Sequence, residues 1–306
     1  MGDLPLVSVV TPSFNAARFL EETIRSVCGQ DYPRLEYIVV DGGSTDGTLD
    51  ILKAHAGRLS YVAGPDDGAA DAINKGFARA RGEILAWLNA DDTYLPGAVA
   101  KAVEALSANP QAGAVYGEGY WTDAAGKVLG RYPAVACDVA ALGRECGICQ
   151  PACFIRREAM EAAGKLNAGL RASFDYDLWI RLAKRYRLVH IAEYLATSRM
   201  HPGNKTLGQR QTVFTESMGL LARHYGYVPV PWVYGYISFL RDRRDQFFEP
   251  LRHSIAAYLL ALPVGLGYNH AHPLRYAREW ISAVKPSNRP RLRTLQGGDR
   301  FRGGLK

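Results

Sequence analysis

Most side chains that could do chemistry in the first hundred residues fall in four short polar segments. These segments are Pro12–Asn15, Asp41–Ser44, Pro65–Gly68 and Asn89–Asp92, and each follows an apolar run. The last segment holds closely spaced carboxylate and amide oxygens, which suit a hard cation such as Mg²⁺ or Mn²⁺. A helix cap before the helix expected near Pro96 would explain the same residues equally well. Both interpretations stay open for this segment taken alone.

The first segment excludes one class of nucleotide site. No glycine lies in the turn after the first apolar run, so nothing of the G-x-G-x-x-G type is there to hold a pyrophosphate. Asp41, after the second run, would repel a phosphate and is better suited to accept hydrogen bonds from a nucleotide base or a ribose. A diphosphate bound nearby would then need another source of positive charge, most economically a divalent cation.

Alternating strand and helix patterns must position these segments. The apolar runs predict strands at Leu6–Thr11, Leu35–Val40, Leu59–Ala63 and Glu83–Leu88. Between them we expect helices over Ala16–Cys28 and Ala69–Ala80, and a helix with Leu49, Ile51 and Leu52 that Ser44 or Thr45 caps. This order predicts an α/β fold with a mainly parallel, Rossmann-like sheet flanked by helices. Ligands bind beyond the carboxyl ends of strands in such sheets, so the four polar segments predict a single site.

Five ordered motifs in the chain resemble glycosyltransferase family 2, whose catalytic domain has the GT-A fold. The motifs are Val9–Asn15, Val39–Thr48, Asp71–Gly76 leading to Ala86–Asp92, Gln150–Ala152, and Phe174–Trp179. The resemblance runs from Val7 to about Thr206, roughly two thirds of the chain. It implies a nucleotide-diphospho-sugar transferase that inverts the anomeric carbon. The implied donor is a nucleotide-diphosphate sugar, with UDP-sugars favoured, and the implied acceptor is a hydroxyl of a polysaccharide, lipid-linked or protein-linked glycan.

The resemblance also implies which residues bind the donor. Asp41 would bind the base or the ribose, with Thr11, Pro12 and Asn15 shaping that pocket and Asp67 nearby. The full set of implied donor-binding residues is Thr11, Pro12, Asn15, Asp41, Asp67, Asn74, Lys75, Asn89 and Ala90.

A divalent metal, Mn²⁺ or Mg²⁺, is the implied cofactor. Asp91 stands where the D-x-D motif of the family places its metal-binding carboxylate. The first position of that motif is Asn89 here, which brings one negative charge less and so predicts a lower metal affinity. His201 falls where some relatives place a further metal or phosphate ligand, and a surface or hydrogen-bonded histidine is the alternative interpretation.

Asp175 matches the acid of the E-D motif that acts as general base, although Phe174 replaces the preceding glutamate. A base on one face of the sugar and a metal-held leaving group on the other give a single in-line displacement, hence inversion. We expect Asp175 in the first turn of a helix, where a capping function is the alternative. Asp177 and Trp179 are expected to be scaffold.

The pattern changes beyond about residue 205. We therefore predict a catalytic domain over residues 1–205 and a mostly helical extension over residues 206–306, with a helix at Thr206–Tyr225. The apolar stretch Ile255–Tyr268 has roughly 14 residues, fewer than the ~20 that span a bilayer. It predicts either a buried helical hairpin or a helix that lies in a membrane interface.

The positive charge of the chain is concentrated in its last residues. From Lys285 to Lys306 there are seven basic residues and one acid, so this tail supplies +6 of the formal net charge of +7. The nearly neutral remainder argues against nucleic acid as a partner. The tail itself predicts either a solvated end or a contact for anionic lipid headgroups.

Cysteine usage and the N-terminus predict a cytoplasmic protein, either free or peripheral at the cytoplasmic face of a membrane. The five cysteines are an odd number, and the first residues do not resemble a signal peptide. The spacing Cys146-x-x-Cys149-x-x-x-Cys153 lacks a second C-x-x-C pair, so free thiols are favoured over zinc or an iron–sulfur cluster.

Two competing functions were weighed against glycosyl transfer. A sugar-phosphate nucleotidyltransferase would need a basic, glycine-rich loop early in the chain, and Pro12–Asn15 is not one. A non-catalytic nucleotide-sugar or glycan-binding module is the other alternative, because Asn89 and Phe174 both depart from the family pattern. Asp91 and Asp175 are both present and favour the enzyme.

Overall fold

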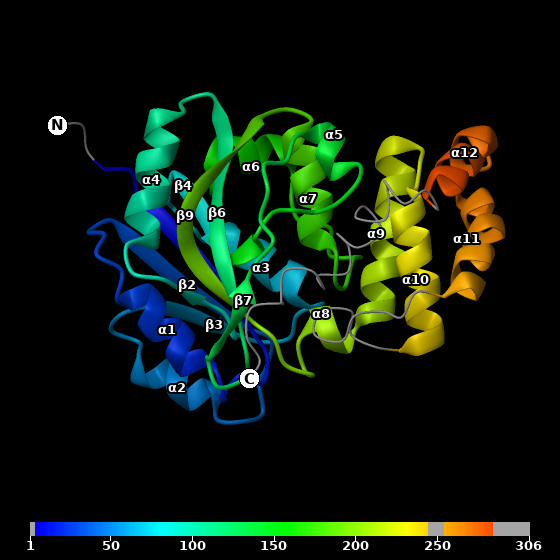
Figure 1. Ribbon diagram of the computed structural model, residues 1–306. Coiled ribbons are helices and arrows are strands. Elements are labelled where there is room, and N and C mark those ends of the chain that lie inside the picture. Colours follow the sequence, from blue (N-terminus) through cyan, green and yellow to red (C-terminus); the bar gives the residue numbers. More distant parts are fainter. Residues whose placement is uncertain (1–3, 244–253, 284–306) are drawn as a thin grey trace. The chain divides into compact units, whose positions relative to one another are not determined.

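The computed structural model describes residues 4–243 and 254–283, which divide into two compact units (Figure 1). The first unit contains residues 4–142 and 146–200, and the second contains residues 143–145 together with the described residues from His201 onward. The assignment of residues 1–205 as a catalytic domain and 206–306 as an extension stays a prediction. The basic tail from Lys285 lies outside the described residues.

A nine-stranded sheet forms the centre of the described first unit, in the order β3-β2-β1-β4-β8-β6-β9-β5, with β7 paired to β6. Its first four strands are parallel, as predicted. They are β1 (Val7–Ser13), β2 (Leu35–Asp41), β3 (Ser60–Ala63) and β4 (Ile84–Trp87).

The other half of the sheet is mixed. It contains β5 (Thr93–Tyr94), β6 (Ala112–Thr122), β7 (Val128–Arg131), β8 (Cys153–Arg156) and β9 (Arg187–Arg199). Strand β8 runs antiparallel to β4 and to β6, whereas the long strands β6 and β9 are parallel to each other. The second long strand thus returns to the site end of the sheet, where β5 pairs with it.

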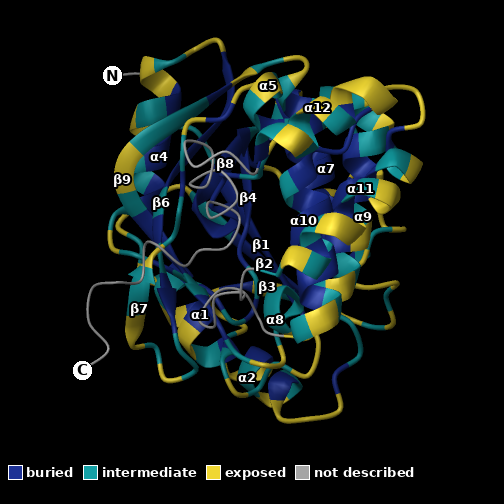
Figure 2. Ribbon diagram, turned by 45° about the vertical axis from the view of Figure 1, so that its right-hand side comes forward, coloured by how far each residue is buried: buried dark blue, intermediate teal, exposed yellow. Residues whose placement is uncertain are grey.

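Helices cover both faces of this sheet. They are α1 (Leu20–Cys28), α2 (Thr48–Ala54), α3 (Ala69–Phe77), α4 (Ala98–Ala108), α5 (Val139–Leu142), α6 (Arg157–Ala163) and α7 (Phe174–Ala183), with a 3₁₀ turn at Gln150–Ala152. Alternate residues of each strand point to opposite faces. Val7 and Val9 join the core with α1 and α4, while Val10 lies against Gly76 of α3. Strands β1, β2 and β4 are accordingly buried (Figure 2).

Two helix starts differ from the sequence prediction. Helix α1 begins at Leu20 rather than Ala16. The backbone N–H groups of residues 16 and 17 instead donate to the side chains of Thr48 (2.9 Å) and Asp46 (3.1 Å). Helix α2 begins at Thr48 and is not capped by Ser44 or Thr45. The Ser44 hydroxyl instead donates to the Asp41 carboxylate, 2.6 Å away.

The second unit consists of helices. Its described elements are α8 (Lys205–Gly208), α9 (Arg210–Tyr225), α10 (Val230–Asp242), α11 (Ile255–Tyr268) and α12 (Pro273–Ala283). The predicted helix at Thr206–Tyr225 is therefore split into α8 and α9. Among residues 4–243 and 254–283, none of the helices combines the length and the apolar character that a membrane crossing requires.

The five cysteines form no disulfide, and all of them lie in described residues. Cys149 and Cys153 flank the 3₁₀ turn and are buried. Burial raises the pKa of both thiols, so they stay protonated at neutral pH.

Gly76 lets α3 approach β1, and its replacement tests that packing. A Cβ at Gly76 would overlap the Val10 side chain, so Gly76→Ala should lower the free energy of unfolding by about 1–2 kcal/mol in spite of the better helix propensity of alanine. Gly219 of α9 has open space around it, so Gly219→Ala should raise it by up to about 1 kcal/mol. Urea unfolding of both variants measures this, and equal stabilisation would contradict the packing argument.

Candidate functional site

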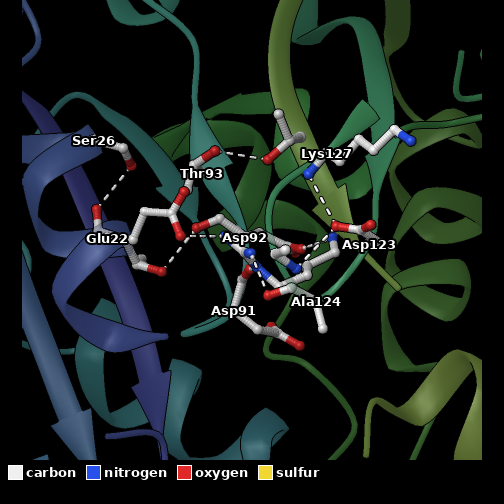
Figure 3. A network of polar contacts seen from close by, with 12 residues as sticks. Glu22, Ser26, Asp91, Asp92, Thr93, Asp123, Ala124 and Lys127 are labelled. Atoms are coloured by element: carbon white, nitrogen blue, oxygen red, sulfur yellow. Dashed lines mark hydrogen bonds and ion pairs between the residues drawn. The ribbon is translucent and has the colours of Figure 1, made fainter. Parts of the chain in front are cut away.

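The turn after β4 holds two neighbouring carboxylates in different environments. The chain leaves the strand at Leu88, whose N–H donates to the carbonyl of Val10 (2.9 Å), and it turns at residues 89–92. Asp92 is buried at 3% exposure, whereas Asp91 is partly exposed. In Figure 3 the Asp91 carboxylate points away from the network of dashed lines around Asp92. Asp92 is thus part of the scaffold, and ligand binding by Asp91 stays a prediction.

Asp92 is stabilised by one hydrogen bond from the distant strand β9 and one from within its own turn. One carboxylate oxygen accepts the backbone N–H of Arg199 (2.8 Å), and the other accepts Nδ2 of Asn89 (3.1 Å). Burial raises the pKa of Asp92 well above its usual range, the charge of Asp91 raises it further, and the two hydrogen bonds oppose the shift. The turn therefore adds less negative charge to the site than its two aspartates suggest.

The Arg199 guanidinium connects three parts of the first unit around this turn. Its Nε donates to the carbonyl of Asp91 (2.8 Å) and its Nη1 to the carbonyl of Ala124 (3.1 Å). Its Nη2 pairs with Glu22 of α1 (2.5 Å), and the group lies over the Phe19 ring. With the Arg199 side chain only 2% exposed, these contacts fix the backbone that carries Asp91. The sequence analysis missed this residue.

Helix α1 holds the same turn from its other side. The buried Thr23 hydroxyl lies 3.0 Å from the carbonyl of Ala90 and 2.8 Å from that of Asp92. Ala90, an implied donor-binding residue, is itself buried, so its side chain contributes shape rather than a polar contact. Thr23 was also missed, since a lone threonine in an amphipathic helix carries no sequence pattern that marks it.

Asn89 is an amide where the implied motif has a carboxylate, and its neighbours explain the difference. Its Nδ2 donates to Asp92 (3.1 Å) and to Oε1 of Gln150 (3.0 Å), and Nε2 of Gln150 donates to the carbonyl of Trp87 (2.9 Å). An aspartate at position 89 could donate neither bond and would place a second charge beside a buried acid. Among the described residues Oδ1 of Asn89 accepts no hydrogen bond, so it can meet a ligand.

Helix α7 brings Asp175 to this end of the sheet. Trp179 of α7 stacks on Trp87 of β4, with ring centroids 5.3 Å apart and 14° between the planes. Asp175 precedes Trp179 by four residues and so lies on the same side of the helix, one turn nearer its start. The predicted helix start is confirmed: α7 begins at Phe174, and Asp175 in its first turn accepts the N–H of Tyr176 (2.7 Å).

The charges of Asp175 and Asp92 both act on one buried phenol, that of Tyr132. Burial raises the pKa of Tyr132 strongly, and the charges of nearby groups, Asp175 and Asp92 among them, add to the shift. Asp177, in contrast, pairs with Arg181 (2.9 Å), whose Nη2 binds the carbonyl of Lys165 (3.0 Å). These contacts support the expected scaffold function of Asp177.

Asp41 closes a tight turn at the end of β2. It is fully buried, and it accepts the N–H groups of Gly43 (3.1 Å) and Ser44 (2.8 Å) as well as the Ser44 hydroxyl (2.6 Å). Gly43 has φ +88°, which a glycine adopts without strain. The Ser44 hydroxyl in turn accepts the N–H of Asn15 (2.7 Å). Contact between Asp41 and a donor stays a prediction.

The predicted pocket residues of the first segment lie partly inside β1. Thr11 and Pro12 belong to the strand and are buried, which corrects the expectation that the polar segment begins at Pro12. The Thr11 hydroxyl lies 3.0 Å from the Tyr37 hydroxyl. Asn15 is exposed, has φ +48°, and accepts the N–H of Thr45 through Oδ1 (2.9 Å). The loops after β1 and β2 are therefore joined through Asn15.

The loop after β3 lies close to the loop after β2. A Cβ at Gly42 would be 2.6 Å from a carboxylate oxygen of Asp66, so the Asp66 side chain would have to move to make room for a larger residue. Asp67 is exposed, and its N–H donates to Asp71 (3.1 Å). Lys75 pairs with Asp71 (2.8 Å), and this hydrogen bond raises the pKa of Lys75.

Asn74 serves as a structural clamp. Its Nδ2 donates to the carbonyl of Leu166 (2.9 Å) and its Oδ1 accepts the N–H of the same residue (2.9 Å). Both ends of the amide are thus engaged with backbone before the start of α7. Direct donor binding by Asn74 stays a prediction and would require one of these bonds to be exchanged.

His201 is the first residue of the second unit, whereas Asp91 belongs to the first unit. Its carbonyl accepts the N–H of Asn204 (3.0 Å) in the turn before α8. Among the described residues, no group of three or more His, Cys, Asp or Glu side chains could hold a metal ion. A cation at Asp91 would therefore take most of its ligands from a bound phosphate and water, an arrangement that Mg²⁺ often adopts.

Comparison with known proteins identifies the family. Residues 8–164, just over half of the chain, match the family model described as Glycosyl transferase family 2. The chain belongs to glycosyltransferase family 2. The matched residues include the strand ends β1 to β4 and the Asp91 turn, but not α7 with Asp175.

Curated relatives of this glycosyltransferase family 2 member match over part of their length. An uncharacterized glycosyltransferase of Rickettsia typhi is 27% identical over 215 residues, which cover 66% of each chain. A putative teichuronic acid biosynthesis glycosyltransferase of Bacillus subtilis is 43% identical over 104 residues, or 33% of this chain and 41% of the relative. The chain thus spans about two thirds of the length of these relatives or less.

Solved structures confirm the predicted fold class, an α/β sheet flanked by helices with a helical C-terminal region. Staphylococcus aureus TarS 1–349 in complex with UDP has a TM-score of 0.62 at 16% identity, covering 97% of this chain and 89% of that one. A mannosyltransferase of Pyrobaculum calidifontis in complex with GDP-Man and Mn²⁺ has a TM-score of 0.58 at 20% identity, covering 98% and 88%.

The raised pKa of Asp92 makes a stability prediction. Folding favours the protonated Asp92 carboxyl. Its contribution to the free energy of unfolding is therefore fully present below the ordinary pKa of 3.8 and is lost as pH rises through the raised pKa. Between the ordinary and the raised pKa, the free energy of unfolding of the wild type should fall relative to that of Asp92→Asn by up to about 1.4 kcal/mol per pH unit. Urea unfolding between pH 4.5 and about 8 measures the difference.

Asp46→Asn is the control of opposite sign. Burial alone would raise the Asp46 pKa, but hydrogen bonds from Thr48 and Ala17 lower it overall. Its stabilisation is therefore present above pH 3.8 and is lost only as pH falls through the lowered pKa. If the difference in free energy of unfolding between the wild type and Asp92→Asn stays constant over the same pH range, the raised pKa of the buried Asp92 carboxyl is contradicted.

Proposed function

We propose that this chain transfers a sugar from a nucleotide-diphosphate donor, with UDP-sugars favoured, to an acceptor hydroxyl with inversion at the anomeric carbon. One observation carries the proposal. The Trp87–Trp179 stack joins α7, which carries the base candidate Asp175, to β4, the strand that leads into the turn with Asp91, a metal-ligand candidate. Family membership gives the reaction class, and this arrangement supplies the two groups that the reaction requires.

The donor nucleoside would lie over the ends of β1, β2 and β3. There the joined loops of Asn15, Asp41 and Asp66 form a rigid backbone frame beside buried Thr11. Structures of S. aureus TarS in complex with UDP and with UDP-GlcNAc, and of the mannosyltransferase with GDP-Man, support a nucleotide sugar as ligand of this fold.

Asp91 would hold Mn²⁺ or Mg²⁺, helped by Oδ1 of Asn89, and His201 is a further candidate ligand. Such an ion supplies charge to stabilise a departing diphosphate. The donor set fits: one exposed carboxylate and one open amide oxygen leave positions for phosphate oxygens and water. The Mn²⁺ in the mannosyltransferase structure supports this choice of ion.

Asp175 would act as general base. It takes the proton of the acceptor hydroxyl as that oxygen bonds to the anomeric carbon, while the bond from this carbon to the diphosphate breaks and the diphosphate leaves with the electron pair. Attack and departure on opposite faces invert the anomeric carbon. The position of Asp175 at the start of α7 favours its anionic form.

The acceptor class rests on the relatives. One is named for teichuronic acid biosynthesis, and an O-antigen biosynthesis protein of Myxococcus xanthus is 33% identical over 204 residues, which are 64% of this chain and 16% of that protein. These names support a hydroxyl on a cell-envelope polysaccharide or its lipid-linked precursor as acceptor.

Two substitutions separate the proposed functions of the carboxylates. Asp175→Asn should keep donor-induced thermal stabilisation in the presence of Mn²⁺ but lose about 10²–10⁴-fold in turnover, because only the proton acceptor is removed. Asp91→Asn should lose both turnover and the Mn²⁺-dependent part of the stabilisation. Asp50→Asn, an exposed carboxylate of α2, should match the wild type.

The measurement combines thermal shift across UDP- and GDP-sugars with sugar release and transfer, and NMR of the product anomer. Full activity of Asp175→Asn would refute the base assignment, and a retained anomeric configuration would refute inversion. Donor binding without turnover against any acceptor would instead support a binding module.

A further inference from the structure

Helix α11 is built with small residues on its protein side and large apolar residues on its solvent side. Ala257, Ala261 and Gly265, spaced by four residues, are its buried positions. The large side chains Ile255 (81% exposed), Leu259 (56%), Leu260 (46%) and Val264 (37%) lie on the exposed side. The helix contains no charged residue. An amphipathic helix of a soluble bundle has the opposite arrangement.

Packing within the α11–α12 hairpin requires those small residues. A Cβ at Gly265 would overlap the Tyr276 ring, and the Tyr276 hydroxyl donates to the carbonyl of Ala261 (2.8 Å). Tyr258 and Trp280 stack with centroids 4.4 Å apart, and each donates to the backbone carbonyl of the other (2.6 and 2.9 Å). The hairpin is thus complete without the large apolar residues.

Helix α12 extends the exposed apolar surface and adds positive charge. Leu274 (72% exposed) and Ile281 (59%) are seven residues apart, on one side of the helix, with exposed Arg278 between them. Glu279, the acid of α12, is used inside the unit, where it accepts from the Tyr227 hydroxyl and from the N–H of Val230. The exposed charge on this helix is therefore basic.

We propose that this surface binds an anionic lipid bilayer in the plane of its headgroups. We call it the hairpin face, and its residues are Ile255, Leu259, Leu260, Val264, Leu274 and Ile281. A 14-residue helix is about 21 Å long, less than the ~30 Å hydrocarbon core, so α11 would lie along the interface with its large side chains inserted.

The charge of the chain selects this occupant over a second copy. The residues after α12 carry seven basic side chains and one acid, next in sequence to the hairpin face. Two copies joined through this face would bring like charges together, whereas an anionic membrane surface attracts each basic residue. The inference is independent of the proposed glycosyl transfer, since it uses no residue of that site.

The test is sedimentation of the full-length chain with sucrose-loaded vesicles of phosphatidylcholine, with and without phosphatidylglycerol. The wild type should partition to the anionic vesicles and less so at high salt. The double variant Leu259→Asp/Leu260→Asp should partition about tenfold less or weaker still, because two inserted side chains are lost. The matched control Leu4→Asp/Val128→Asp, at 46% and 52% exposure, should bind as the wild type does.

Further measurements separate the contributions. Arg289→Glu/Arg291→Glu/Arg293→Glu should weaken binding and remove most of its salt dependence. Release of sugar from a soluble donor should be equal in the wild type and the Leu259/Leu260 variant, which distinguishes this proposal from failure of the catalytic one. Unchanged vesicle binding by the Leu259/Leu260 variant would overturn the proposal. A wild type that does not bind anionic vesicles would also overturn it. A wild-type dimer that the variant dissociates, without vesicle binding, would overturn it in favour of a copy-to-copy interface.

Discussion

A carboxylate removed from water must be hydrogen-bonded or neutralised, and Asp92 imposes that requirement on the centre of the site. Its oxygens are satisfied by the Arg199 backbone of β9 and by the Asn89 amide. Strands β4 and β9 lie apart in the sheet order, and Asp92 joins the turn after β4 to β9 next to the β5–β9 pairing. The Arg199 side chain then fixes the carbonyl of Asp91, and Asp91 itself is left facing outward. The exposed acid is positioned by the buried one.

The same constraint explains why the turn carries an amide at position 89. With Asp92 buried, the neighbouring side chain must donate a hydrogen bond, and Asn89 donates to both Asp92 and Gln150. A carboxylate there would need a cation to relieve the repulsion. The turn is therefore structured by its own residues without a cation. Asn89 thus brings less negative charge to the turn than an aspartate would, and its hydrogen bonds hold the turn in shape.

Sequence patterns predicted the local elements well and the long-range ones poorly. Apolar runs predicted the four parallel strands, and the turn residues after them predicted the polar strand ends. Asp175 predicted the start of α7. The mixed half of the sheet does not, because β8, β6 and β9 pair across large sequence separations. Arg199 was missed because two of its partners are backbone carbonyls, which no side-chain motif records. The segment before α1 is bound by Asp46 and Thr48, about thirty residues further on, which no local pattern records.

Helices α1 and α11 bury apolar surface by opposite rules. In α1 the large residues Leu20, Ile24 and Val27 face the core, and their removal from water stabilises the fold. In α11 the buried residues are alanines and a glycine, which bury little area, while larger side chains meet solvent. Close packing against Tyr276 excludes large residues from the inner side, so hairpin stability depends on aromatic contacts and hydrogen bonds instead. The apolar area of α11 therefore contributes little to folding, and its burial can stabilise only an association.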